Sequence, residues 1–274
     1  MEGNWLFAFG LTLFAGLSTG LGSLVVFFKK KPGLRLLSVG LGFSSGVMIF
    51  VSLVELLPQG AAEMSRGLGE GLGNWAAHGC FFAGILFSAL IDRLVPEPSN
   101  PHEAVSQESL LRAAGQGPVT GEIKQASLAR VGMMSALAIA IHNFPEGMAT
   151  FVAGMTDASL GISIAVAVAI HNIPEGIAVA VPVYFATGQR GKAATQSFLS
   201  GLAEPLGALV VFALLSPWIN ATVVGALLAL VGGVMVFISF DELLPTAREY
   251  SRGHEVIVGL VGGMAIMAVS LLLL

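Results

Sequence analysis

Long apolar segments alternate with short polar connections along almost the whole chain. Each apolar segment has about the 20 residues that an α-helix needs to cross the hydrocarbon core of a bilayer. The pattern therefore predicts an all-α integral membrane protein with eight transmembrane helices. The expected spans are residues 5–28, 34–57, 75–95, 131–154, 160–186, 194–216, 221–244 and 255–273.

One connection is much longer than the others. Residues 96–130 are polar and contain four prolines, a composition typical of linkers. We therefore expect residues 1–274 to form a single transmembrane domain, with residues 96–130 as a cytoplasmic linker loop between helices three and four.

The basic residues predict the orientation of the chain in the membrane. Of the 13 Lys and Arg residues, 12 lie in or beside the connections that follow spans one, three, five and seven, and only Arg66 lies on the other side. Because Lys and Arg collect in cytoplasmic loops, both termini are expected outside the cytoplasm.

Composition narrows the class further. Hydrophobic residues make up 55% of the chain and charged residues 11%, whereas soluble domains carry about 25% charged residues. The single Cys80 excludes an internal disulfide and a cysteine-cluster metal site. Basic residues are too sparse for a nucleic-acid interface, so the lipid bilayer is the expected environment.

Two pairs of segments repeat within the sequence. Residues 46–58 match residues 233–245 at nine of thirteen positions, and residues 16–27 match residues 201–212 at eight of twelve. The members of each pair lie an odd number of spans apart, so they run in opposite directions through the membrane. This predicts a 3+2+3 inverted repeat, an arrangement recurrent among transporters that bind substrate at the repeat interface. Spans three and eight show no convincing match.

The hexapeptide His-Asn-x-Pro-Glu-Gly occurs at residues 142–147 and again at 171–176, in the middle of spans four and five. Residues four apart share one face of a helix. His142 can therefore point inward with Glu146, as can His171 with Glu175. Two imidazoles and two carboxylates suit zinc or a similar divalent ion. The alternative is a pair of proline-kinked packing helices whose His and Glu side chains bond to each other.

Further polar residues lie beside these motifs. Asn143 and Asn172 lie about 100° around their helices from each His, where their amide oxygens can serve a second, harder metal site. Glu204 lies within span six, and Thr19 is its repeat counterpart. Ionisable residues inside a membrane are rare and usually functional. Since no Lys or Arg lies mid-span to pair with these glutamates, the site is expected to bind cations or protons.

Four other residues remain open to two interpretations. Met48 in span two is either a thioether ligand or a core methionine. Glu55, Asp241 and Glu242 lie near opposite ends of spans two and seven. They either line the entrance and exit of a pathway or are ordinary interfacial carboxylates.

Two enzyme classes conflict with the motifs. An intramembrane metalloprotease requires His-Glu-x-x-His on a helix, and no such string occurs. An ATP-driven pump requires a phosphate-binding loop, but Gly191-Lys192 is followed by Ala193 and lacks the upstream glycine.

Taken together, the eight spans, the paired hexapeptides and the Gly201-Leu-Ala-Glu-Pro205 segment resemble the ZIP family of divalent metal transporters, and its bacterial zinc transporters in particular. The resemblance covers the whole chain. It implies a multi-pass protein of the cell inner (plasma) membrane that is not an enzyme, that needs no cofactor and that moves metal ions into the cytoplasm. It also implies a homodimer.

The resemblance further implies a binuclear centre between spans four and five. Zn²⁺ is the expected substrate, with Fe²⁺, Mn²⁺, Co²⁺ and Cd²⁺ as further substrates. One metal site would use His142, Glu146, His171 and Glu175, with Met48 as a further candidate, and the adjoining site would use Asn143, Glu146, Asn172, Glu175 and Glu204.

Overall fold

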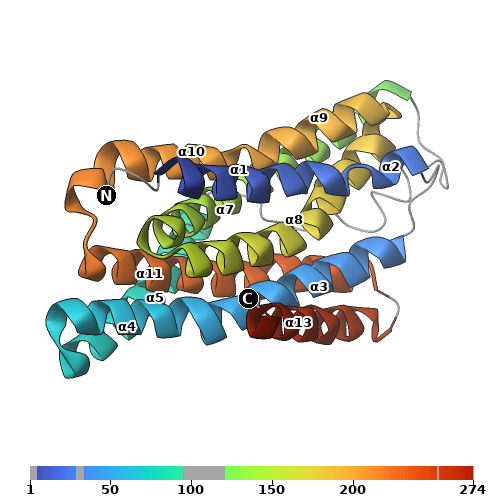
Figure 1. Cartoon of the computed structure of the whole chain (residues 1–274). Coiled ribbons are helices and arrows are strands. Elements are labelled where there is room, and N and C mark those ends of the chain that lie inside the picture. Colours follow the sequence, from blue (N-terminus) through green and yellow to red (C-terminus); the bar gives the residue numbers. More distant parts are fainter. Residues whose placement is uncertain (1–4, 29–33, 95–120, 252, 274) are drawn as a thin grey trace.

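The computed structural model describes residues 5–28, 34–94, 121–251 and 253–273, and every element in these ranges is helical (Figure 1). The first half contains α1 (Trp5–Gly22), α2 (Val25–Phe28), α3 (Leu34–Val51), η1 (Ser52–Leu56), α4 (Leu57–Leu68), α5 (Glu70–Leu94) and α7 (Gly121–Thr156). The second half contains α8 (Ala158–Thr187), α9 (Arg190–Gly201), α10 (Ala203–Val210), η2 (Val211–Leu215), η3 (Ser216–Trp218), α11 (Ala221–Ile238), η4 (Ser239–Leu243), α12 (Leu244–Glu249) and α13 (Glu255–Leu273).

These helices have the lengths of membrane spans. In the described ranges, seven helical segments are long and apolar enough to cross a bilayer. Helix α7 adds a further rod of 36 residues, which at 1.5 Å per residue is about 54 Å long. The chain is thus an all-helical membrane protein with seven or eight membrane-spanning helices.

Spans two and seven are longer than expected and contain the same irregularity. Each passes through a five-residue π-helical turn, Ser52–Leu56 in one and Ser239–Leu243 in the other. In both, the N–H after the turn bonds a serine carbonyl five residues back, and a proline follows one residue later. A proline lacks an N–H and crowds the preceding turn, which a widened turn relieves. The helices therefore continue to Leu68 and Glu249 instead of ending at 57 and 244.

Span six is not the continuous helix that its apolar pattern predicts. Helix α9 ends at Gly201, and α10 begins at Ala203 after one turn residue. Pro205 has no N–H to donate to the Gly201 carbonyl, which favours a break there. The break places Glu204 in the first turn of α10, where it is fully buried.

The expected linker loop is shorter than residues 96–130. Helix α7 begins at Gly121, so residues 121–130 are helical and that part of the prediction is wrong. Residues 95–120 lie outside the described part of the chain. The role of this connection therefore stays a prediction.

The helices divide into two groups. In Figure 1 the upper group contains α1, α7, α8, α9 and α10, and the lower group contains α3, α4, α5, α11 and α13. The main contacts between the groups are those of α3 with α8 and of α11 with α7. Any relative movement of the two groups must therefore take place along these two helix pairs.

Glycines bring the helices of the upper group into backbone contact. A Cβ atom at Gly147 of α7 would overlap the carbonyl oxygen of Glu204, and one at Gly176 of α8 would overlap that of Thr19. Gly147 and Gly176 occupy the same place in the two hexapeptides, and Glu204 is the repeat counterpart of Thr19. The same contact between a hexapeptide glycine and a backbone carbonyl is thus made twice, at positions that correspond to each other in the sequence repeat.

The lower group shows the same duplication. A Cβ atom at Gly263 of α13 would overlap the carbonyl oxygen of Phe43, and one at Gly84 of α5 would overlap that of Leu230. Leu230 becomes the repeat counterpart of Phe43 when the alignment of spans two and seven is extended three residues toward the N-terminus at the same offset. Spans three and eight therefore occupy equivalent positions although their sequences show no match.

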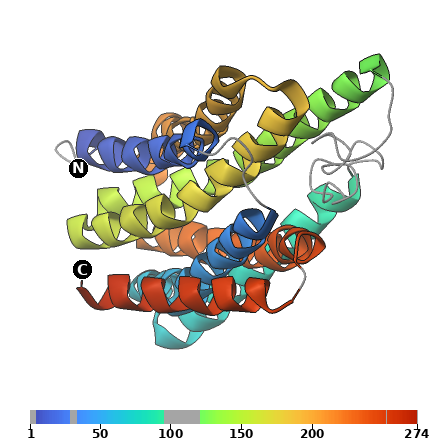
Figure 2. The same cartoon turned by 90° about the vertical axis from the view of Figure 1, so that its right-hand side faces the viewer.

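The ends of the helices agree with an even number of crossings. In Figure 2 the start of α1 and the end of α13 lie at one end of the molecule, at the left. The end of α5, the start of α7 and the end of α12 lie at the opposite end. Arg93 and Arg248, near the ends of α5 and α12, are thus both far from the termini.

Two adjacent glycines of α13 allow the packing to be tested. Gly263→Val should lower the melting temperature in detergent by about 5 °C or more, because the new side chain must displace the α3 backbone. Gly262→Val should have a much smaller effect, since nothing lies within 4 Å of a Cβ at Gly262. Equal losses from the two variants would contradict the packing of α13 on α3.

Candidate metal centre

The two hexapeptides lie side by side in the middle of the molecule. Helices α7 and α8 pack against each other, and Pro145 and Pro174 lie inside them without ending them. The side chain of Asp157 accepts a hydrogen bond from the Leu160 N–H and caps α8. Each motif therefore lies on a continuous helix, well away from both helix ends.

Three predicted ligands meet at this helix pair. Glu146 of α7 and His171 and Glu175 of α8 each offer one atom to a cluster whose members all lie within 4.8 Å of one another. All three side chains are buried. Ligand atoms around one zinc ion lie about 3–4 Å apart, so small side-chain rotations would complete a shared site.

The imidazole of His171 is oriented by the backbone. Its Nδ1 lies 3.1 Å from the Ala167 carbonyl oxygen, which accepts the Nδ1 proton. Its Nε2 lies 3.2 Å from Glu146 Oε2. With its proton on Nδ1, His171 offers a lone pair at Nε2, and Glu146 Oε2 is also an acceptor. A proton between these two atoms would join them, and a metal ion can take the place of that proton. A histidine held through its second nitrogen is typical of metal sites.

Among the residues that the structure describes, several buried oxygens at the centre have no hydrogen-bond partner. They are Glu146 Oε1, Glu204 Oε2 and Asn172 Oδ1. An unpaired buried acceptor costs about 1–3 kcal/mol, and an isolated carboxylate costs more. A cation would satisfy all three atoms, whereas another buried carboxylate would not.

The second ligand set converges on Glu204. Asn172 donates its amide to the Ala15 carbonyl at 2.9 Å and also to Glu204 Oε1. With both amide hydrogens directed to oxygens, Asn172 Oδ1 is available as a ligand atom. The structure therefore brings Asn172 and Glu204 together, as the second site requires.

Asn143 completes the polar surroundings of Glu175. Its hydrogen bonds are best satisfied when its amide nitrogen donates to Glu175 Oε2 at 3.2 Å and to the Ile139 carbonyl at 3.0 Å. Asn143 is fully buried. In this orientation it supports Glu175 from the neighbouring helix α7.

One residue that contacts the centre was not among the predicted site residues. Ser44 of α3 donates to Glu175 Oε1 at 3.1 Å. Its hydroxyl also lies 3.9 Å from the sulfur of Met48. Ser44 precedes Met48 by one helical turn and shares its helix face. This spacing is the sequence feature that could have indicated that Ser44 lies beside the centre.

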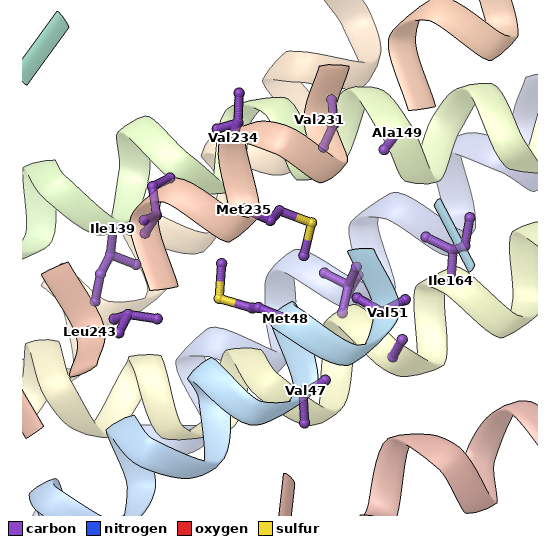
Figure 3. Close-up of a cluster of buried hydrophobic side chains, with 14 of the residues drawn as sticks. Val47, Met48, Val51, Ile139, Ala149, Ile164, Val231, Val234, Met235 and Leu243 are labelled. Atoms are coloured by element: carbon purple, nitrogen blue, oxygen red, sulfur yellow. The ribbon is translucent and has the colours of Figure 1, made fainter. Parts of the chain in front are cut away.

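Met48 lies in an apolar cluster. Figure 3 shows the thioether groups of Met48 and its repeat counterpart Met235 pointing toward one another, with Val51 and Val231 nearby. Both methionines are buried. This packing fits a core methionine, while the 3.9 Å distance to the Ser44 hydroxyl places Met48 beside the centre. A ligand role for Met48 stays a prediction.

The other residues singled out in the sequence do not belong to this cluster, or their side chains lie outside the described part of the chain. The side chain of His142 is not among the described ones. Glu55 lies in η1, within the span that continues to Leu68. Asp241 and Glu242 lie with Asp92 on the wall of a cavity of about 500 Å³ that is otherwise mostly apolar. Their roles at an entrance or exit stay predictions.

Comparison with known proteins agrees with this geometry. A family model described as ZIP Zinc transporter matches residues 2–271. The chain is 57% identical to the zinc transporter ZupT of Corynebacterium efficiens over 98% of both proteins, and 54% identical to that of Lysinibacillus sphaericus over the full length of both. It is 52% identical to the zinc transporter ZupT of Streptococcus mutans over 97% of both. With matches of this extent, the chain belongs to the ZIP family of zinc transporters.

Proposed function

We propose that this protein takes up divalent transition-metal ions, zinc foremost, through a binuclear centre between α7 and α8. The observation that carries the proposal is the buried group of Glu146, His171 and Glu175, together with the unpaired oxygens around it. Membership of a transporter family removes the metalloprotease alternative, because the chain is a transporter and not an enzyme.

The ligands divide into a softer and a harder set. The softer set is His142, Glu146, His171 and Glu175, and the harder set is Asn143, Asn172 and Glu204 with the two shared glutamates. Imidazole favours zinc, whereas oxygen ligands also accept manganese and iron. Zinc is named as the substrate of the relatives. Iron, manganese, cobalt and cadmium are further proposed substrates, which the family resemblance implies.

An inverted repeat supports transport over static binding. The duplicated glycine contacts relate α1 to the α9–α10 segment, α3 to α11 and α5 to α13. Each pair is separated by an odd number of spans, so its members run in opposite directions. Repeats of this kind allow one central site to face either side of the membrane in turn.

The two helix groups provide the parts that would move. The ligands on α7, α8 and α10 belong to the upper group of Figure 1, and α3 and α11 of the lower group border them. We infer alternating access in which the groups shift along the α3–α8 and α11–α7 contacts. The ion is then replaced by protons or water as it leaves.

The orientation of the protein in the membrane follows from the basic residues. The end of the molecule near Arg93 and Arg248 is assigned to the cytoplasm. Both termini then lie on the outer face of the inner membrane. A homodimer stays a prediction from family resemblance.

Glu146→Ala and Glu175→Ala should each abolish ⁶⁵Zn uptake into reconstituted vesicles. Each removes a carboxylate of the central cluster. The control is Glu70→Ala, which changes an exposed glutamate at the start of α5. Uptake at the unmodified rate by either central variant would remove the proposed function.

His171→Ala should weaken zinc uptake more than manganese uptake. Loss of an imidazole ligand harms a borderline ion such as zinc more than a hard ion. The measurement is the ratio of zinc to manganese uptake at equal concentrations. His78→Ala, which changes an exposed histidine of α5, should leave that ratio unchanged. An equal loss for both metals in His171→Ala would argue against the ligand assignment.

Glu204→Gln should melt at the same or a higher temperature than the unmodified protein in the presence of EDTA. The reason is that Glu204 Oε2 is buried without a partner, so its loss removes an unfavourable group. With zinc added, the variant should gain less in melting temperature than the unmodified protein. Glu63→Gln breaks the pair of Glu63 with Arg66 and should lower the melting temperature in EDTA. A lower melting temperature for Glu204→Gln in EDTA would contradict the assignment of Glu204 as a ligand kept for its ion.

A further inference from the structure

Two adjacent serines of α3 use their hydroxyl groups differently. Ser45 donates to the Leu41 carbonyl at 2.9 Å, the usual bond of a helical serine to the preceding turn. Ser44 instead points across the boundary between the helix groups. Its hydroxyl lies 3.1 Å from Glu175 Oε1 and 3.4 Å from the His171 carbonyl oxygen of α8. Both serines are fully buried.

The bond from Ser44 orients a metal-binding carboxylate. Glu175 receives Ser44 at Oε1 and the amide of Asn143 at Oε2. These neutral donors come from two different helices and hold the carboxylate in one rotamer. Such support lowers the cost of arranging the ligand when an ion binds.

The other half of the repeat lacks this support. The counterpart of Ser44 is Val231, a buried apolar residue of α11. The counterpart of Glu175 is Glu146, whose Oε1 has no hydrogen-bond partner in the described part of the chain. The two central glutamates therefore differ in how they are held, although their hexapeptides match.

We propose that Ser44 is a positioning residue that presents Glu175 to the metal ion from the opposite helix group. The proposal rests on the metal centre inferred above. Because Ser44 belongs to α3 and Glu175 to α8, a shift of the groups separates the two side chains. The centre then holds its ion less tightly after the shift than before it. A carrier needs this difference in affinity to release its ion.

The test is zinc uptake by Ser44→Ala in vesicles, with Ser45→Ala as the matched control. Loss of an outer partner of a metal ligand typically costs about 10–100-fold in affinity. We expect Ser44→Ala to raise the KM for zinc by about 10-fold or more with a maximal rate within about twofold of the unmodified protein. Ser45→Ala and Ser44→Thr, which keeps the hydroxyl, should both stay within about threefold in KM.

The outcomes separate this inference from the proposed function. An unchanged KM in Ser44→Ala overturns the positioning role. So does a loss confined to the maximal rate, or a Ser44→Thr variant that is as impaired as Ser44→Ala, since packing would then explain the effect. Glu175→Ala is measured in the same vesicles. If Glu175→Ala loses uptake while Ser44→Ala is normal, only the inference about Ser44 fails. If Glu175→Ala transports normally, the metal centre itself fails.

Discussion

The structure depends on one electrostatic constraint, which is the burial of three glutamates in a membrane interior that supplies no Lys or Arg side chain to neutralise them. Glu146, Glu175 and Glu204 are all at most 1% exposed. A lone carboxylate in a medium of low polarity is strongly unfavourable. Only protons, hydrogen-bond donors or a cation can compensate for it. The asparagines, the serine and the unpaired oxygens around the centre are all arranged in response to this constraint.

Close backbone packing makes this arrangement possible. The residue after each hexapeptide glutamate is a glycine. Each of these glycines packs directly against the backbone of a helix from the other repeat half. Gly147 lies against the carbonyl oxygen of Glu204 itself, so the residue that follows one proposed ligand packs on the backbone of another. Any side chain at Gly147 would push α10 away and move Glu204 from the shared site. Packing and ligand geometry are therefore determined by the same contacts.

The sequence predicted the parts of the centre that depend on helical periodicity. His171 and Glu175 share a face because they are four residues apart, and Glu146 joins them because α7 and α8 are adjacent. Ser44 was missed because its contact joins two distant helices and depends on a rotamer that no local pattern encodes. The breaks near Gly201 and the turns before the prolines are local backbone responses, which apolar periodicity does not record. Spans three and eight are related through backbone contacts, so their sequences were free to diverge.

The departures from symmetry are concentrated on one helix. An exact inverted repeat would support the ligands of α7 and α8 equally. Instead, Glu204 accepts from Asn172 and Ser44 donates to Glu175, both on α8, whereas the counterpart contact on α7 is a 3.5 Å bond between Asn143 and the neutral Thr19 hydroxyl. Their repeat counterparts, Thr19 and Val231, carry no charge. Under the proposed function, α8 thus presents prearranged ligands, while Oε1 of Glu146 on α7 has no hydrogen-bond partner among the described residues. A centre built in this way responds to its ion mainly through α7, which packs on α11 of the other helix group.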